Sequence, residues 1–268
     1  MQYSQKTFSH NKKLLYAWFQ AMYTRVDLML YAEIERMDLI TIAQDVESEI
    51  FRIESFANRF NESSLLSHVN RNAFHENVQI TPELFDILKV CQLYNEQTNG
   101  YFDIAIQTIN FQNIEARKFV LESESCSVRF LHPNLQLDLS GFIKGYALGV
   151  VIDFLKEKSV VHALINIGNS SIGAMGNHPA GEGWKIAVPA SDCECVLIDE
   201  CLTTSGNSNT TQWPIINPLT GAKTENKQPV SVITSNPATG EVASKVAYMA
   251  EKYELSSIMQ KLDARMTN

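Results

Sequence analysis

The stretch from Gly141 to Lys158 constrains the fold most strongly, because its helical spacing comes with apolar side chains on most of its surface. A helix of this kind is stable only when most of it is buried. It begins directly after DLS (138–140) and is followed by VVHALINI (160–167), an apolar run with the length of a strand. The rest of the chain must therefore supply sheet and helix that cover this segment.

Other segments show the periodicity of either a strand or a helix. Residues 22–32 alternate like a half-buried strand, whereas 38–57 carry an apolar stripe with helical spacing. Thr81-Pro82 supplies the N-cap and first residue of a helix that we expect to end before Gly100. Further strands are expected within 116–137 around a turn at His132-Pro133, and at 184–189, 196–202 and 228–235, followed by a helix at 239–252 and a shorter last one. The order predicts an α+β fold, with antiparallel sheets packed against helices.

Length and composition set the class of protein. The 268 residues are 45% hydrophobic and 19% charged, without a linker or an internal repeat, so we expect one domain over 1–268 with 1–20 as a peripheral segment. The net charge of −8 and the lack of a basic run argue against nucleic-acid binding. Five scattered cysteines indicate reduced thiols. We expect no membrane span, and a cytoplasmic location unless a leader has been removed.

Three loops of small polar residues follow predicted strands, at 140–141, 168–171 and 203–207. Their backbone N–H groups and hydroxyls can cradle a phosphate, although ordinary turns use the same residues. Lys144 lies between two glycines at the start of the buried helix, where its ammonium group suits an anion or simply points to water. Taken together, the loops and the lysine indicate a nucleotide-like ligand. The sequence has neither the G-x-S-x-G nor the H-E-x-x-H motif of common hydrolases.

Seven motifs then occur in an order that resembles one known family. LDLSGFIKGYALG (137–149) is similar to the pattern D-L-G-G-x-A-K-G-Y, and MYT (22–24) to M-G-T. The other matching stretches are IFRIESFANRFNESSLLSHVN (50–70), TNGYFDIAI (98–106), ALINIGN (163–169), TTSGN (203–207) and IINPLTGA (215–222). These are motifs of the ApbE family, the FAD:protein FMN transferases, and the resemblance covers about residues 20 to 250.

The resemblance implies a fold, a ligand and a reaction. In that family FAD lies in a cleft, magnesium neutralises its pyrophosphate, and FMN is transferred to a Ser or Thr hydroxyl of an acceptor protein with release of AMP. The implied partners are therefore a flavin nucleotide and a flavin-acceptor protein. Carried over motif by motif, the expected nucleotide contacts are Met22, Tyr101, Asp103, Lys144, Gly168, Thr204, Ser205 and Gly206.

The chain departs from the family at the metal. The family's ligand positions fall at Ile143, Ser244, Ala247 and Tyr248, so a serine replaces the carboxylate and a tyrosine replaces the threonine. Magnesium prefers carboxylate oxygen in octahedral geometry, and we expect no metal here. Two alternatives stay open at this helix: Glu241, one turn earlier, could supply a carboxylate, or Lys245 could act as a built-in cation in place of magnesium.

Three functions are compatible with these residues. The first is a relative that binds FAD or a similar nucleotide while the lost magnesium ligands weaken or abolish transfer. The second is an active flavin transferase with an atypical site. The third is a non-catalytic protein with the ApbE fold that acts through protein contacts. The sequence assigns no catalytic residue.

Overall fold

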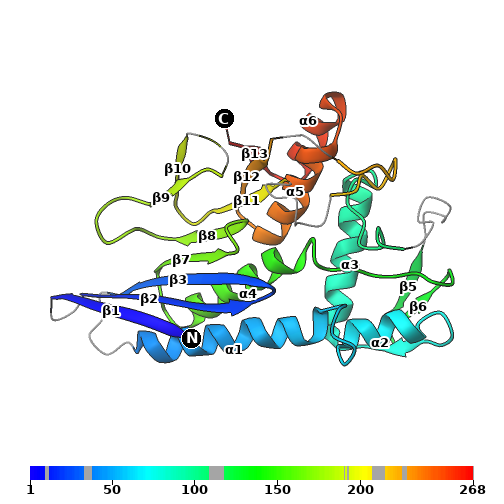
Figure 1. Ribbon diagram of the computed structural model, residues 1–268, viewed down its shortest axis with the longest axis horizontal. Coiled ribbons are helices and arrows are strands. Elements are labelled where there is room, and N and C mark those ends of the chain that lie inside the picture. Colours follow the sequence, from blue (N-terminus) through cyan, green and yellow to red (C-terminus); the bar gives the residue numbers. More distant parts are fainter. Residues whose placement is uncertain are drawn as a thin grey trace.

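The centre of the molecule is an eight-stranded sheet with the strand order β1-β2-β3-β7-β8-β11-β12-β13 (Figure 1). The computed structural model describes residues 1–9, 12–32, 38–108, 118–189, 191, 193–206, 215–224 and 228–267. Every pairing in this sheet is antiparallel. Its strands are β1 (Gln2–Ser9), β2 (Lys12–Ala21), β3 (Thr24–Ala32), β7 (His162–Ile167), β8 (Ser171–Met175), β11 (Cys201–Ser205), β12 (Val230–Thr234) and β13 (Arg265–Met266).

Helices and two smaller sheets complete the fold. Figure 1 shows α1 along the lower side of the view, α4 between α1 and the strands β7 and β8, α5 beside β11 and β12, and α3 at the right-hand end with α2, β5 and β6. The helices are α1 (Leu39–Ala57), α2 (Leu65–Asn72), α3 (Pro82–Gln97), α4 (Ile143–Glu157), α5 (Pro237–Met249) and α6 (Lys252–Lys261). The smaller sheets are β4 (Val78–Gln79), β6 (Ser127–Phe130) and β5 (Phe119–Glu122), and β10 (Glu194–Leu197) with β9 (Trp184–Ala187). The expected α+β fold with antiparallel sheets is confirmed.

Helix α4 is buried, as its apolar surface predicts. Its buried residues are Ile143, Gly145, Ala147, Leu148, Val151, Ile152 and Leu155. The helix approaches α5 very closely at Gly145, where an added Cβ would lie 2.3 Å from the carbonyl oxygen of Pro237 and 2.6 Å from Cγ of Glu241. Only glycine permits this distance. The crossing places the first turn of α4 directly against the first turns of α5.

Three strand ends meet at one edge of the large sheet. The turn between β2 and β3 consists of Met22 and Tyr23, both with positive φ, as in a two-residue hairpin of type I′. Strand β3 pairs with β7, so the next turn, at 168–170, lies beside the first one. Thr204 N–H donates to the carbonyl of Ser170 at 2.8 Å, which brings the end of β11 to the same place. Residues far apart in sequence thus share one edge.

Some elements differ from the sequence-based expectations. The strand expected at 196–202 is two strands, β10 and β11, in different sheets, because the chain reverses at Asp199 in the left-handed region. The turn between β5 and β6 spans 123–126, whereas His132-Pro133 follows β6; residues 116–117 lie outside the described residues. Strand β8, for which the sequence predicted no element, is buried throughout between β7 and β11.

The first 20 residues form β1 and most of β2. Strand β2 buries Leu15, Ala17 and Phe19 in the core formed with α1 and α4. The segment therefore contributes to two strands of the large sheet and to its hydrophobic core. Among the helices of the described chain, none combines the length and apolar character needed to cross a membrane.

Candidate functional site

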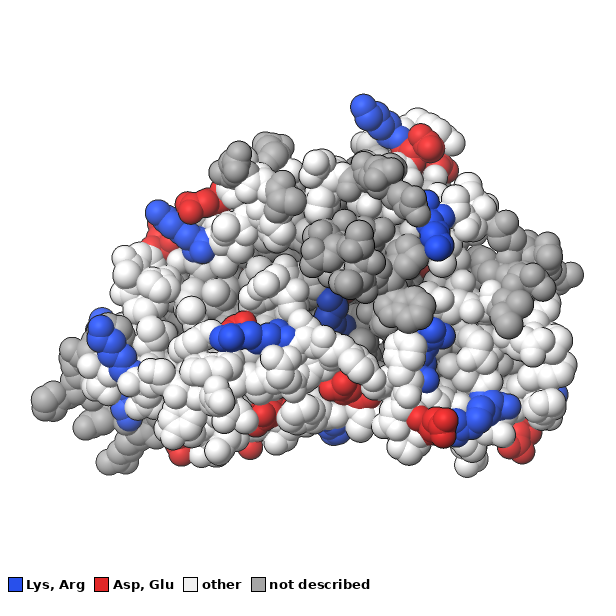
Figure 2. All heavy atoms as spheres, in the orientation of Figure 1, with Lys and Arg blue, Asp and Glu red and all other residues white. Residues whose placement is uncertain are grey.

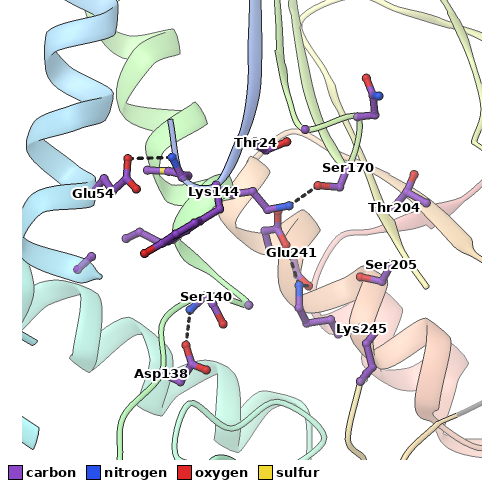
Figure 3. Close-up of a pocket in the computed structure, with 18 of the residues that line it drawn as sticks. Thr24, Glu54, Asp138, Ser140, Lys144, Ser170, Thr204, Ser205, Glu241 and Lys245 are labelled. Carbon is purple, nitrogen blue, oxygen red and sulfur yellow. Dashed lines mark hydrogen bonds and ion pairs between the residues drawn. The ribbon is translucent and has the colours of Figure 1, made fainter. Parts of the chain in front are cut away.

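A cavity of about 680 Å³ opens where the shared sheet edge faces α1, α4 and α5. In Figure 2 the molecular face is hollowed near its middle, and Lys or Arg atoms lie within the hollow. Figure 3 shows labelled lining residues from the sheet edge, the three helices α1, α4 and α5, and the loop before α4. The volume falls within the range of small-molecule and cofactor pockets.

Six of the eight expected nucleotide contacts line this cavity. They are Met22, Lys144, Gly168, Thr204, Ser205 and Gly206. The other two lie elsewhere among the described residues. Tyr101 is buried and donates its hydroxyl to Glu254 Oε2 at 2.7 Å. Asp103 pairs with Lys118 in a separate cavity of about 510 Å³. The residues that the fold brings together in this cavity are those at the strand ends of the large sheet and at the start of α4.

One wall of the cavity carries two lysines around one carboxylate. Glu241 is only 3% exposed, and its Oε2 accepts from Lys245 Nζ at 2.7 Å while its Oε1 accepts from the Ser171 hydroxyl. Lys144, on α4, donates to the hydroxyl of Ser170 in the β7–β8 turn (Figure 3). The Lys245 ammonium also donates to the Glu241 carbonyl at 3.1 Å. Both lysines line the cavity.

The charges of this wall are coupled. Burial lowers the pKa of Lys144, with the positive charge of Lys245 acting in the same direction and Glu241 opposing it. Burial tends to raise the pKa of Glu241, but Lys245 and then Lys144 outweigh this effect and lower it overall. The carboxylate is therefore ionised at neutral pH. With both lysines protonated, two positive charges share one negative charge, and an anion is favoured nearby.

The opposite wall is acidic and was largely missed by the sequence reasoning. Glu54 accepts the backbone N–H of Met22 at 2.8 Å and thereby fixes the β2–β3 turn. Asp138 accepts the N–H of Ser140 at 2.8 Å and pairs with Arg59 Nε at 3.3 Å. Glu54 and Asp138 stand within matched motifs, but the motifs alone do not tell which side chains point inward.

Two aromatic rings stand in the cavity lining and are largely exposed. Tyr23 is 79% exposed and Phe60 is 53% exposed, with ring centroids 6.3 Å apart in an edge-to-face arrangement. Asn58 Nδ2 donates to the Tyr23 hydroxyl at 3.2 Å. Exposed rings of this size beside a pocket offer a flat apolar surface for a planar ligand. Phe60 was not expected as a contact.

The residues at the family's metal positions are engaged or buried. Ser244 is fully buried, with its Oγ 2.8 Å from Ser205 Oγ and 3.2 Å from the Glu241 carbonyl, to which it donates. Tyr248 is buried, Ala247 lies outside the cavity lining, and Ile143 lies in it. The described part of the chain has no cluster of three or more His, Cys, Asp or Glu side chains arranged to hold a metal.

Comparisons with solved structures show what the fold is similar to. The flavin transferase ApbE from Vibrio cholerae superposes with a TM-score of 0.79 at 17% identity, over 99% of this chain and 94% of the other. The ApbE protein from Thermotoga maritima gives a TM-score of 0.78 at 17% identity, over 94% of each chain. At these identities the likeness shows a common fold: that of the flavin transferases.

Sequence comparison adds the family. The FAD:protein FMN transferase of Chlamydia muridarum is 26% identical over 247 residues, covering 79% of this chain and 77% of the relative. That of Klebsiella pneumoniae is 24% identical over 237 residues, covering 75% and 73%. The model of the ApbE family matches residues 22–110 and 106–267. The chain belongs to the ApbE family.

Proposed function

We propose that the cavity binds FAD. The observation that carries this proposal is the pairing of a two-lysine wall with an exposed aromatic pair across one cavity of about 680 Å³. FAD has both features that such a cavity selects, a doubly charged pyrophosphate and planar rings. Membership of the ApbE family, with relatives named FAD:protein FMN transferases, supports the same ligand.

The walls suit different parts of this ligand. The pyrophosphate belongs beside Lys144 and Lys245, where positive charge exceeds negative charge. The acidic wall of Glu54 and Asp138 repels phosphate but accepts hydrogen bonds from sugar or ribityl hydroxyls. A flavin or adenine ring can stack against Tyr23 or Phe60 at a gain of about 1 kcal/mol. A nucleotide with only one sugar-type chain and one ring system would make fewer contacts with the cavity walls than FAD does.

The residues present do not fit a magnesium ion. Both oxygens of the buried Glu241 carboxylate already accept hydrogen bonds, one of them from a lysine ammonium. Ser244 offers a neutral hydroxyl that is bonded to Ser205. Magnesium requires octahedral oxygen ligands with negative charge, and Lys245 would repel it. We therefore propose that the protein binds FAD but transfers FMN to a protein hydroxyl, with release of AMP, only at a very low rate.

Isothermal titration with FAD tests the proposal, and AMP release in the presence of a Ser/Thr-containing acceptor protein measures transfer. We expect micromolar or tighter FAD binding and AMP release close to background. Rapid, magnesium-dependent AMP release would refute the proposed loss of transfer. The absence of any FAD binding would refute the binding proposal and leave a fold that acts through protein contacts.

A further inference from the structure

We propose that Lys245, held by Glu241, takes the place of a divalent cation and binds the pyrophosphate directly together with Lys144. This inference rests on the proposed binding of FAD. It assigns Lys144 and Lys245 as the anion-binding groups and Glu241 as a positioning residue. It also predicts that binding of the nucleotide does not need a metal.

The position of Lys245 is built into the packing. A Cβ on Gly141 would lie 3.0 Å from Lys245 Cε, so the lysine stem passes over a position without a side chain. At its end the ammonium is held by the side chain and the carbonyl of Glu241, at 2.7 and 3.1 Å. With 19% of its side chain exposed, Lys245 keeps limited access to the cavity. The charge is thus fixed before a ligand arrives.

Both lysines keep hydrogen-bond donors that an anion can use. An ammonium group has three N–H donors. Lys245 uses two of them on Glu241, and Lys144 uses one on Ser170. Among the described residues, at least one N–H of each lysine therefore remains available to an anion. Charge-assisted hydrogen bonds to phosphate are the strong kind, and burial makes them stronger.

The balance of charge in the cavity lining also favours an anion at this wall. Glu241 neutralises one of the two lysines, and the remaining charged groups of the lining are Arg59, Glu54 and Asp138 on the other wall. The Asp138 carboxylate is paired with Arg59, so it does not offset the excess positive charge at α5. A pyrophosphate brings two negative charges to a wall with one uncompensated positive charge. A divalent cation added to the same wall would increase the repulsion instead.

The experiment compares FAD with riboflavin, which has the flavin ring but no phosphate. Wild-type protein, Glu241→Gln/Lys245→Met and the control Lys156→Met are titrated with each ligand in EDTA and in millimolar magnesium. The double variant removes both charges of the pair, so that no unpaired carboxylate stays buried. Lys156 lies on α4 but is exposed, which makes it a matched loss of one lysine. Near-UV circular dichroism checks that each variant is folded.

We expect the double variant to raise the Kd for FAD by about 10- to 100-fold, because charge-assisted hydrogen bonds are lost. The Kd for riboflavin should change less than about threefold. Magnesium should alter the wild-type Kd for FAD by less than about threefold. Lys156→Met should bind like the wild type.

Other results overturn the inference. Equal losses for FAD and riboflavin would mean that the pair acts on the fold alone. Wild-type binding of FAD that requires magnesium would mean that a metal holds the phosphates. Either result leaves the binding of FAD intact, whereas a wild-type protein that binds no FAD refutes the proposed function itself.

Discussion

Replacing Gly145 by alanine tests whether the close contact of α4 and α5 builds the cavity wall. The new Cβ would lie 2.3 Å from the Pro237 carbonyl oxygen, so the two helices must separate by about 1 Å to reach ordinary contact. Overpacking of this kind costs about 1–3 kcal/mol, against a gain of up to about 1 kcal/mol from helix propensity. We expect a free energy of unfolding lower by about 1–2 kcal/mol.

Gly149 on the same helix is the matched control. A Cβ there would lie 3.6 Å from Pro237 Cγ, which is ordinary van der Waals contact. Gly149→Ala should therefore be neutral or more stable by up to about 1 kcal/mol. Urea unfolding followed by tryptophan fluorescence measures both variants. Equal stability of the two would refute the contact as the reason for glycine at 145. Weaker FAD binding by Gly145→Ala alone would link the crossing to the site.

Three further predictions concern the charges, the thiols and the turn. At pH 7 Glu241→Gln should lower the free energy of unfolding by about 2–4 kcal/mol, because a buried lysine loses its partner. Since the folded-state pKa of Glu241 is depressed, this difference between variant and wild type should persist above about pH 4.3 and shrink as the pH falls below it. Urea unfolding at pH 7 and at about pH 3.5 measures the difference. Burial raises the pKa of the Cys201 thiol to about 12 and that of Cys91 well above its usual value, so Ellman's reagent should modify the exposed Cys193 in the folded protein and reach Cys91 and Cys201 only after unfolding. The double variant Met22→Asn/Tyr23→Gly should stabilise the protein by about 1–2 kcal/mol, because it replaces two residues with positive φ by residues that favour this conformation. Loss of the exposed Tyr23 ring should at the same time weaken FAD binding. A higher melting temperature together with a higher Kd in FAD titration would show that the turn is kept for binding rather than for stability.

The sequence predicted the elements whose periodicity is local. In β3 the buried face carries the alternating residues Val26, Leu28 and Leu30, and in α1 the buried face carries the apolar residues with helical spacing. Both patterns can be read from the sequence of the element alone. Strand β8 could not be recognised in this way. Its glycine and alanine are buried because β7 and β11 cover both edges and α4 covers a face, and Gly173 lies against Leu148 and Ile152 of α4. Such a strand depends on its neighbours rather than on its own pattern.

The site shows the same division between local and distant information. Glu241 and Lys245 are four residues apart on one helix, a spacing that favours an ion pair. From the sequence the two residues are alternatives: Glu241 could supply a carboxylate to a metal, or Lys245 could replace the metal as a cation. The structure joins them, so the carboxylate that could have held a metal is the partner of the lysine. That Glu241 also acts electrostatically on Lys144 depends on the close crossing of α4 and α5 at Gly145, which no local pattern encodes. The cationic wall thus depends on one turn of α5 and on Lys144 of α4, while much of the remaining cavity lining comes from the strand ends of the large sheet.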